Sequence, residues 1–246
     1  MRKRIGWMTL AAAGMMAAGL DVRGADVSAD LPILSAYVWR GQVLNDEAVI
    51  QPALNVVTGG WGVNVWGNFN ATDRVTGDAD FSEIDLTLSY GGRLGPAAYG
   101  VGVIEYLFPN TDYASTREIY VSLSLPDAPV VPTLSVYRDV EEADGFYASF
   151  ALSKTYKIGD KTTLGLSASL GAGDEDYNAF YFGVDDAALN DVNAGATLSF
   201  ALSDTVTLVP GVQYTWLPDP DIRDGAEALY FDTEQLTGSL KLTLIF

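Results

Sequence analysis

The sequence predicts an all-β protein: a single antiparallel up-and-down transmembrane β-barrel of about 12 strands, with 10–14 possible. Three observations lead to this fold class. Segments of about ten residues alternate between apolar and polar side chains, the connections between them alternate between short and long, and the chain ends on an aromatic residue, Phe246. A strand of this kind has one face for lipid and one for water, which is the repeating unit of a membrane barrel.

The amino terminus predicts export. Basic residues at positions 2–4 precede an uncharged apolar stretch from Ile5 to Leu20, which is the layout of a secretory signal peptide. The stretch is shorter than the roughly 20 residues that a membrane-spanning helix needs. We therefore expect residues 1–24 to be a cleaved signal peptide and residues 25–246 to form an outer-membrane β-barrel.

The last segment of the chain shows the alternation most clearly. Leu240, Leu242, Leu244 and Phe246 occupy its even positions, whereas its odd positions are mostly polar. Segments with the same period predict strands at residues 31–40, 47–58, 61–70, 81–90, 98–108, 117–125, 130–138, 145–156, 162–171, 190–202, 205–216 and 234–246.

The connections between these strands predict which end of the barrel faces outward. The short ones are residues 59–60, 91–96, 126–129, 158–161 and 203–204, whereas 172–189 and 217–233 are the longest. Membrane barrels have short periplasmic turns and longer outer loops, and an even strand count returns both termini to the periplasm. A secreted β-sandwich also has alternating strands. The terminal aromatic favours the barrel. A last strand that ends on an aromatic residue, here Phe246, resembles the signal by which the barrel assembly machinery recognises outer-membrane barrels.

Aromatic residues fall at the ends of the predicted strands, as in the two girdles of membrane barrels. Those at the periplasmic ends are Trp61, Tyr90, Tyr156 and Phe246, and those at the outer ends are Trp39, Phe108, Phe146 and Trp216. Arg138 and Lys154 have the parity of the lipid-facing set, near strand ends where long basic side chains can reach the interface.

The composition excludes several classes of function. The formal net charge is −18, and −21 without residues 1–24, so nucleic acid, which is bound through Lys and Arg, is not an expected partner. The chain has no cysteine and no histidine, which removes disulfides, thiolates and the commonest general base and metal ligand. We expect no enzyme activity, no cofactor and no metal site. Glu83 and Asp85 could share a proton, but lining a water-filled interior explains them better.

The polar faces of the predicted strands meet inside the barrel. By parity, the pore-lining candidates are Arg40, Gln51, Asn55, Asn64, Asn68, Glu83, Asp85, Glu118, Tyr120, Tyr137, Gln213 and Lys241. Glu105 is ambiguous, because both faces of its strand are apolar or small. Two arrangements fit this set: a hydrated pore, or an interior plugged by pairing of Arg40 and Lys241 with the carboxylates. We favour the pore, which at this strand count passes only small solutes.

The outer loops are rich in acidic residues. One group is Asp174, Glu175, Asp176, Asp185, Asp186 and Asp191, and the other is Asp219, Asp221, Asp224, Glu227, Asp232 and Glu234. Oxygen clusters of this kind can bind calcium, but the second run does not fit the EF-hand pattern. Solvation of the loops explains the charges more simply.

One part of the chain resembles a known family. The segment Tyr37–Gln42 reads YVWRGQ, Asn45 and Asp46 follow, Ile50–Asn55 reads IQPALN, and a Gly-Trp-Gly turn leads into VWGN at Val65–Asn68. This resembles the opening of the TorF-like porins, in which an aromatic-rich strand ends in Arg-Gly before a short polar loop and a second strand. The resemblance covers about 40 residues and implies a porin in the bacterial outer membrane.

These patterns lead to one expected function and one alternative. We expect a porin-like passive channel for small polar or cationic solutes through a narrow acidic lumen, because rings of carboxylates favour cations. The alternative is a non-conducting structural or surface-binding barrel. In both cases the expected partners are outer-membrane lipid and lipopolysaccharide, with small solutes added for the channel.

Overall fold

The computed structural model describes residues 24–246, so the predicted signal peptide lies, apart from Gly24, outside the described residues. Two helices and a set of strands follow one another along the chain. They are β1 (Asp26–Leu34), β2 (Tyr37–Trp39), β3 (Gln42–Asn45), β4 (Val49–Ile50), β5 (Ala53–Thr58), β6 (Trp61–Asn70), β7 (Phe81–Leu94), β8 (Ala97–Leu107), β9 (Thr116–Ser124), β10 (Val131–Asp139), β11 (Phe146–Lys157), β12 (Thr162–Gly173), α2 (Glu175–Phe182), β13 (Ala188–Ala201), β14 (Val206–Trp216), α3 (Pro220–Leu229) and β15 (Glu234–Ile245).

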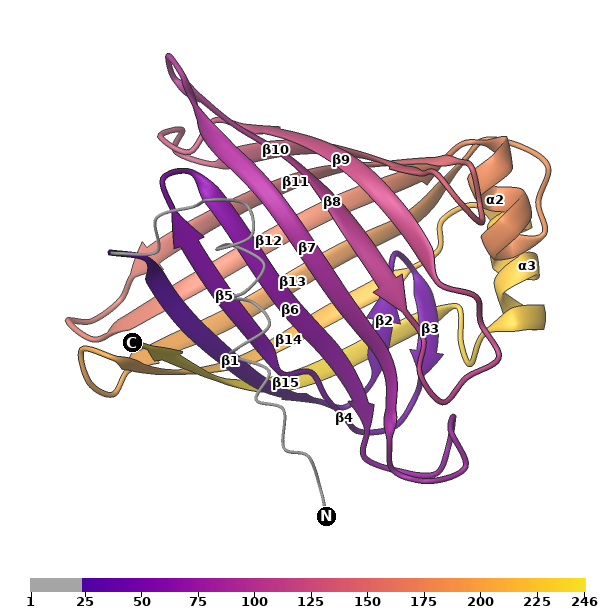
Figure 1. The fold of residues 1–246 in the computed structure, drawn as a ribbon, viewed down its shortest axis with the longest axis horizontal. Helices are drawn as coiled ribbons and strands as arrows, with labels where there is room; N and C mark the ends of the chain where they lie inside the picture. Colours follow the sequence, from indigo (N-terminus) through magenta and orange to yellow (C-terminus); the bar gives the residue numbers. More distant parts are fainter. Residues whose placement is uncertain (1–23) are drawn as a thin grey trace.

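The strands form a closed antiparallel barrel of 12 strands, as the sequence predicts (Figure 1). From β6 to β15 each strand pairs with the next one in the chain, and β1 pairs with β15 to close the ring, from Ser28 opposite Ile245 to Leu34 opposite Ser239. The sheet contains 13 strand segments, because β4 and β5 together occupy one position beside β1 and β6. Closure pairs the two edges of the sheet with each other. A membrane barrel requires this, because lipid offers no hydrogen-bond partners to an open edge.

Alternating side chains account for the two faces of the wall. On β9, Ile119, Val121 and Leu123 are each 50 % exposed on the outside, whereas Glu118, which has the opposite parity, is 1 % exposed. The outward set is the surface that lipid would cover, and the inward set meets the interior of the barrel.

The first strand does not run through residues 31–40 as predicted. It ends at Leu34, and the chain then turns into the barrel, forms the hairpin of β2 and β3, and returns to the wall at Val49, which is the pairing partner of Leu34. Residues 35–48 are hereafter the inner hairpin. Its tip is a tight two-residue turn in which Arg40 and Gly41 both have positive φ, 47° and 85°, as a type I′ turn requires.

The predicted strand at residues 47–58 is interrupted at Gln51 and Pro52. Proline has no N–H to donate to a neighbouring strand, so the regular ladder stops there. The neighbours remain joined, because the Gln51 N–H donates to the Pro32 carbonyl at 3.0 Å and the Pro52 carbonyl accepts from the Gly67 N–H at 3.1 Å.

Two short helices lie at one end of the barrel, the end opposite the short turns and the carboxyl terminus (Figure 1). Asp174 caps α2 by accepting from the Tyr177 N–H, and Asp219 caps α3 ahead of Pro220. Both segments were expected from the sequence to be loops, whereas the structure places a helix in each. No helix in the described part of the chain is long and apolar enough to cross a membrane.

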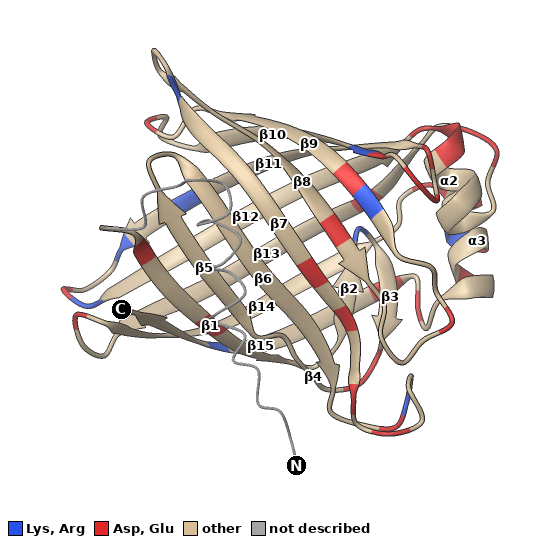
Figure 2. Cartoon of the chain, in the orientation of Figure 1, with Lys and Arg blue, Asp and Glu red and all other residues tan. Residues whose placement is uncertain are grey.

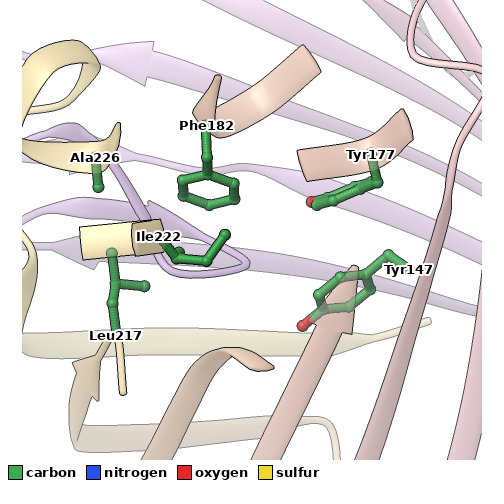
Figure 3. Close-up of a cluster of buried hydrophobic side chains, with 6 residues drawn as sticks. All are labelled: Tyr147, Tyr177, Phe182, Leu217, Ile222 and Ala226. Atoms are coloured by element: carbon green, nitrogen blue, oxygen red, sulfur yellow. The ribbon is translucent and has the colours of Figure 1, made fainter. Parts of the chain in front are cut away.

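A cluster of buried, mostly apolar side chains joins these helices to the barrel wall. Tyr147 of β11 lies against Tyr177 of α2, and Phe182 lies against Ile222 of α3 (Figure 3). Leu217 and Ala226 complete the cluster. The helices are therefore packed onto the barrel end through a small core of their own.

Candidate functional site: the barrel interior

The inner hairpin is held by polar contacts to several strands. The Tyr37 hydroxyl donates to Glu83 Oε2 of β7 at 2.8 Å, and Asn45 Nδ2 donates to Asn70 Oδ1 of β6 at 2.8 Å. The chain after α3 also reaches it, because the Tyr230 hydroxyl donates to Gln42 Oε1 at 2.7 Å. Burial raises the pKa of Tyr230, so its hydroxyl stays a donor. The hairpin thus has defined partners on the wall and in the segment that follows α3.

Arg40, at the hairpin tip, forms a bidentate ion pair with Glu118 of β9. The two N···O distances are 2.6 and 2.7 Å, and the side chains are 9 % and 1 % exposed. The Tyr106 hydroxyl also donates to Glu118, at 2.8 Å. Burial lowers the pKa of Arg40 while the Glu118 carboxylate raises it, and the net shift is upward, so the guanidinium stays charged.

Aromatic rings surround the same guanidinium. Its carbon lies 4.4 Å from the ring centroids of Trp39, Tyr137 and Tyr147. Desolvated cation–π contacts stabilise a buried cation, and together with the bidentate pair they offset the left-handed backbone of Arg40. The ion pair of Arg40 with an interior carboxylate is the kind of contact expected for a plugged interior, which is one of the two arrangements that fit the sequence.

The remaining interior charge is acidic. The charged side chains in the interior include the carboxylates of Asp30, Glu83, Asp85, Glu118, Asp139 and Asp191 and the basic groups of Arg40 and Lys241. Lys241 Nζ lies 3.6 Å from Asp30 Oδ1. Asp139 and Asp191 accept hydrogen bonds from Thr116 and Tyr147, both at 2.7 Å. Asp85 Oδ1 is buried without a hydrogen-bond partner among the described residues.

The other predicted lining residues contact their neighbours along the inner face of the wall. Asn64 Nδ2 donates to Asn55 Oδ1 at 2.8 Å, and Gln51 Nε2 donates to Asn68 Oδ1 at 3.1 Å. Tyr120 packs on Tyr137 with ring centroids 5.5 Å apart, and Gln213 borders two of the cavities described below. Whether a solute passes these residues stays a prediction.

Two residues lie on a different side of the wall from the one expected, and a third resolves an ambiguity. Trp39 and Phe108 are not in an outer girdle: Trp39 packs inside against Tyr106 and Tyr181, and Phe108 pairs with Tyr113 at the outer mouth. Glu105 shares its parity with the exposed Val101, and it forms an ion pair with Arg117 at 2.7 Å. Glu105 therefore belongs to the outer face.

The two basic residues with lipid-facing parity have partners near the strand ends. Arg138 pairs with Asp144 and lies 4.6 Å from the Phe146 ring centroid. Lys154 lies 5.0 Å from the Tyr156 ring centroid. Both arrangements suit long basic side chains that snorkel along the barrel surface.

Two cavities lie between the inner hairpin and one side of the wall. They have volumes of about 160 and 330 Å³ and share Val38, Ser167 and Gln213 in their linings. Most of the wall residues there are small, and include Ser149, Ser153, Ser167, Ser169, Gly195 and Thr197. Small inward side chains on β11, β12 and β13 thus leave room that the hairpin does not fill. We call these residues the small-residue wall.

A third cavity of about 330 Å³ lies on the outer side of the hairpin. It is bounded by the hairpin, the outer ends of β6–β9, α2 and the end of α3, and we call it the outer-mouth pocket. Its lining includes Trp39, Tyr106, Phe108, Tyr113, Tyr181 and Tyr230.

Several of these residues were not identified from the sequence. Tyr106 follows the inward parity of its strand, so the alternation could have found it. Asp191 was expected with the solvated acids of an outer loop, but it lies on β13 and is 1 % exposed inside the barrel. Tyr177, Tyr181 and Tyr230 come from the two outer helices or follow them directly, and only the caps at Asp174 and Asp219-Pro220 signal those helices.

The comparisons with solved structures agree on the barrel fold. The NanC porin has 14 % sequence identity over 89 % of this chain and 98 % of that chain, with a TM-score of 0.51. The corresponding values for the KdgM porin are 9 %, 89 %, 99 % and 0.56. For the COG4313 outer membrane channel from Pseudomonas putida F1 they are 14 %, 92 %, 97 % and 0.55. At these identities the likeness establishes the fold.

The search for relatives among curated proteins found no match. A family model does match, over residues 21–207, and its description is "Bacterial protein of unknown function (Gcw_chp)". The narrower resemblance to TorF-like porins is not part of that description and stays a prediction. Because the match extends over most of the chain, the protein belongs to the Gcw_chp family of bacterial proteins.

Proposed function

We propose that this protein is a porin-like channel of the bacterial outer membrane that passes small polar solutes, with a preference for cations. The observation that carries the proposal is the polar interior, with cavities of about 160 and 330 Å³ along the small-residue wall and about 330 Å³ at the outer mouth. The likeness to porin structures supports it. The predicted TorF-like character is consistent with the same role.

The preference for cations rests on the interior charges. Among the interior charges named above, carboxylates outnumber basic groups, and Arg40 and Lys241 are both paired. A low-dielectric wall strengthens the effect of the unpaired carboxylates on a passing ion. The inner hairpin narrows the path, so that only small solutes fit beside the small-residue wall.

Conductance in planar lipid bilayers tests the proposal. Purified barrels are expected to give small, discrete current steps, and a potassium chloride gradient should produce a reversal potential of the sign that cation preference requires. Ser167→Trp places a large side chain where the two inner cavities meet and should reduce the current severalfold. The control is Leu166→Trp, which alters a neighbouring side chain that is 42 % exposed on the outer face.

A non-conducting barrel is the second candidate, because the Arg40–Glu118 pair and the outer helices close much of the interior. It predicts no current from correctly folded barrels, and an unchanged absence of current in Ser167→Trp. Folded barrels that stay silent would contradict the channel.

A further inference from the structure

We infer that the outer-mouth pocket binds a small organic ammonium compound. The inference gives the proposed cation preference a location, but it requires only binding and not conduction. At about 330 Å³ the cavity has the size of a small-molecule site. Tyr113, at its rim, is 75 % exposed, so the pocket is accessible from the outer end of the barrel.

The arrangement of the aromatic rings favours a cage. Trp39 meets Tyr106 at an interplanar angle of 69° and Tyr181 at 66°, and Phe108 meets Tyr113 at 74°. Rings that meet at such angles enclose a space from several sides. A flat platform for stacking a sugar would need a single open face, whereas an aromatic cage is the usual site for an alkylammonium group.

The charges around the cage favour a cation. Among the described residues that line it, the ionisable acids are Glu83 and Glu142, and no lysine or arginine is present. Neither carboxylate has an ion-pair partner within residues 24–246. The nearby arginines are already paired: Arg40 with Glu118, and Arg74 with Asp46 at 2.8 Å.

Asn70 adds a donor for an oxygen atom of the ligand. Its Oδ1 accepts from Asn45 and from Asn68, which fixes the orientation of the amide. Its Nδ2 is buried without a hydrogen-bond partner among the described residues, and Asn70 lines the pocket. A buried amide donor without a partner is costly, and a hydroxyl or carbonyl oxygen on the ligand would satisfy it. The chemistry is therefore that of a hydroxylated or carboxylated alkylammonium, for which choline is a suitable probe.

Two described features argue against a metal ion as the occupant. No group of three or more acidic ligands that could hold a metal is found in residues 24–246. The walls are largely aromatic, and hard cations prefer several oxygen ligands.

Isothermal titration calorimetry of the folded protein in a non-ionic detergent tests the inference. Choline chloride should bind saturably at one site. Its neutral carbon analogue, 3,3-dimethylbutan-1-ol, should bind at least about tenfold more weakly, because it lacks the charge that the rings and carboxylates stabilise.

Variants separate the cage from the fold. Trp39→Leu and Tyr113→Leu should each weaken choline binding about fivefold, and Glu83→Gln should weaken choline more than the neutral analogue. Tyr113 is the safer position, because its exposed ring contributes little to folding. Tyr214→Leu is the matched control, since Tyr214 stacks on Trp216 at the outer face of the barrel, away from the pocket.

Three outcomes would overturn the inference: no saturable choline binding, equal binding of choline and its neutral analogue, or saturable binding of glucose but not of choline. A barrel that binds choline and carries no current would contradict the proposed channel and leave the pocket standing. A conducting barrel without choline binding would contradict the proposed ligand of the pocket and leave the proposed channel standing.

Discussion

Arg40 combines three features that are individually unfavourable: a buried charge, a left-handed backbone and a position at a hairpin tip. Glu118, the surrounding rings and the neighbouring Gly41 make the combination stable. A Cβ added to Gly41 would lie 2.5 Å from Leu217 Cδ2, so the tip also fits closely against the chain that leads into α3. The geometry of this turn is therefore set by contacts on both sides of the interior.

Arg40→Met should destabilise the barrel by about 3 kcal/mol, because it leaves Glu118 buried without its ionic partner. Unfolding in guanidinium chloride measures this loss. Arg40→Met combined with Glu118→Leu should recover most of it, since neither charge then remains. Arg93→Met removes an exposed pair with Asp127 and should leave the midpoint unchanged. Equal effects of Arg40→Met and Arg93→Met would show that the buried pair is not what holds the hairpin.

A glycine determines how closely α2 approaches the wall. A Cβ added to Gly145 would lie 2.2 Å from the Tyr177 backbone nitrogen and 2.6 Å from its Cα, and backbone atoms cannot move aside as a flexible side chain can. Gly145→Ala should therefore displace the first turn of α2, at a cost of about 1–3 kcal/mol.

Limited chymotrypsin digestion of folded barrels checks this displacement. Gly145→Ala should be cut faster in α2, at aromatic residues that the wild type holds in the cluster with Tyr147. Gly159→Ala is the control, because its added Cβ would lie 3.5 Å from the nearest atom, in ordinary contact. Identical digestion of the two variants would contradict the close-approach account.

At the scale of single residues, the sequence predicts the face of a side chain better than its partner. Parity on β7 and β9 is enough to turn Glu83, Asp85 and Glu118 inward. It cannot show that Glu118 meets Arg40, because that contact depends on 14 residues leaving the wall and folding inward. The expectation that Trp39 lies in the outer aromatic girdle is wrong for the same reason.

The inner hairpin is the element that most changes the interior. It leaves the wall at Leu34 and returns at Val49, and these residues are already pairing partners. A two-residue Asn-Gly turn could therefore replace residues 35–48 and join β1 to β4 directly, since such turns connect adjacent antiparallel strands.

This replacement should keep the barrel closed and increase its single-channel conductance severalfold, because the space beside the small-residue wall would join the outer-mouth pocket. Bilayer recordings give the conductance, and the heat-dependent shift in electrophoretic mobility that is typical of barrels shows folding. Exchange of residues 127–128, in the short turn between β9 and β10, for Asn-Gly is the control for loop surgery, and its conductance should not change. Unaltered current in a folded hairpin-less barrel would show that the hairpin does not constrict the path.

The two helices show where sequence reasoning fails at the scale of elements. The helices α2 and α3 are short, 8 and 10 residues, and carry several acidic residues, and isolated helices of that length are marginal in water. Their stability comes from packing on Tyr147 and on each other, as the close contact of Gly225 with Phe182 shows. That packing can be recognised only once the barrel has placed Tyr147, at the start of β11, and Leu217, which follows β14, at the same end of the barrel.

At the scale of the whole molecule, strand alternation and the lengths of the connections predict the barrel because lipid imposes both. Acidic residues gather in the loops at the end that carries α2 and α3, whereas several of the few basic residues lie toward the opposite end (Figure 2). The interior could not be predicted in the same way, because the alternation of apolar and polar side chains does not show that residues 35–48 fold inward.

The carboxyl terminus lies beside the seam that closes the barrel. The Phe246 N–H donates to the Val27 carbonyl at 3.0 Å beside the β1–β15 seam, and its ring is 68 % exposed. Phe246→Ala keeps the backbone bond and removes only the ring. If the ring is a recognition signal for the barrel assembly machinery, the amount of folded barrel in the outer membrane should fall severalfold, while refolding of the purified variant into lipid vesicles should proceed normally. Phe150→Ala, which removes a ring that is 41 % exposed on the lipid face, is the matched control for lost lipid contact. A defect of equal size in both variants, or a defect of Phe246→Ala in vesicles as well, would assign the terminal ring to stability and not to recognition.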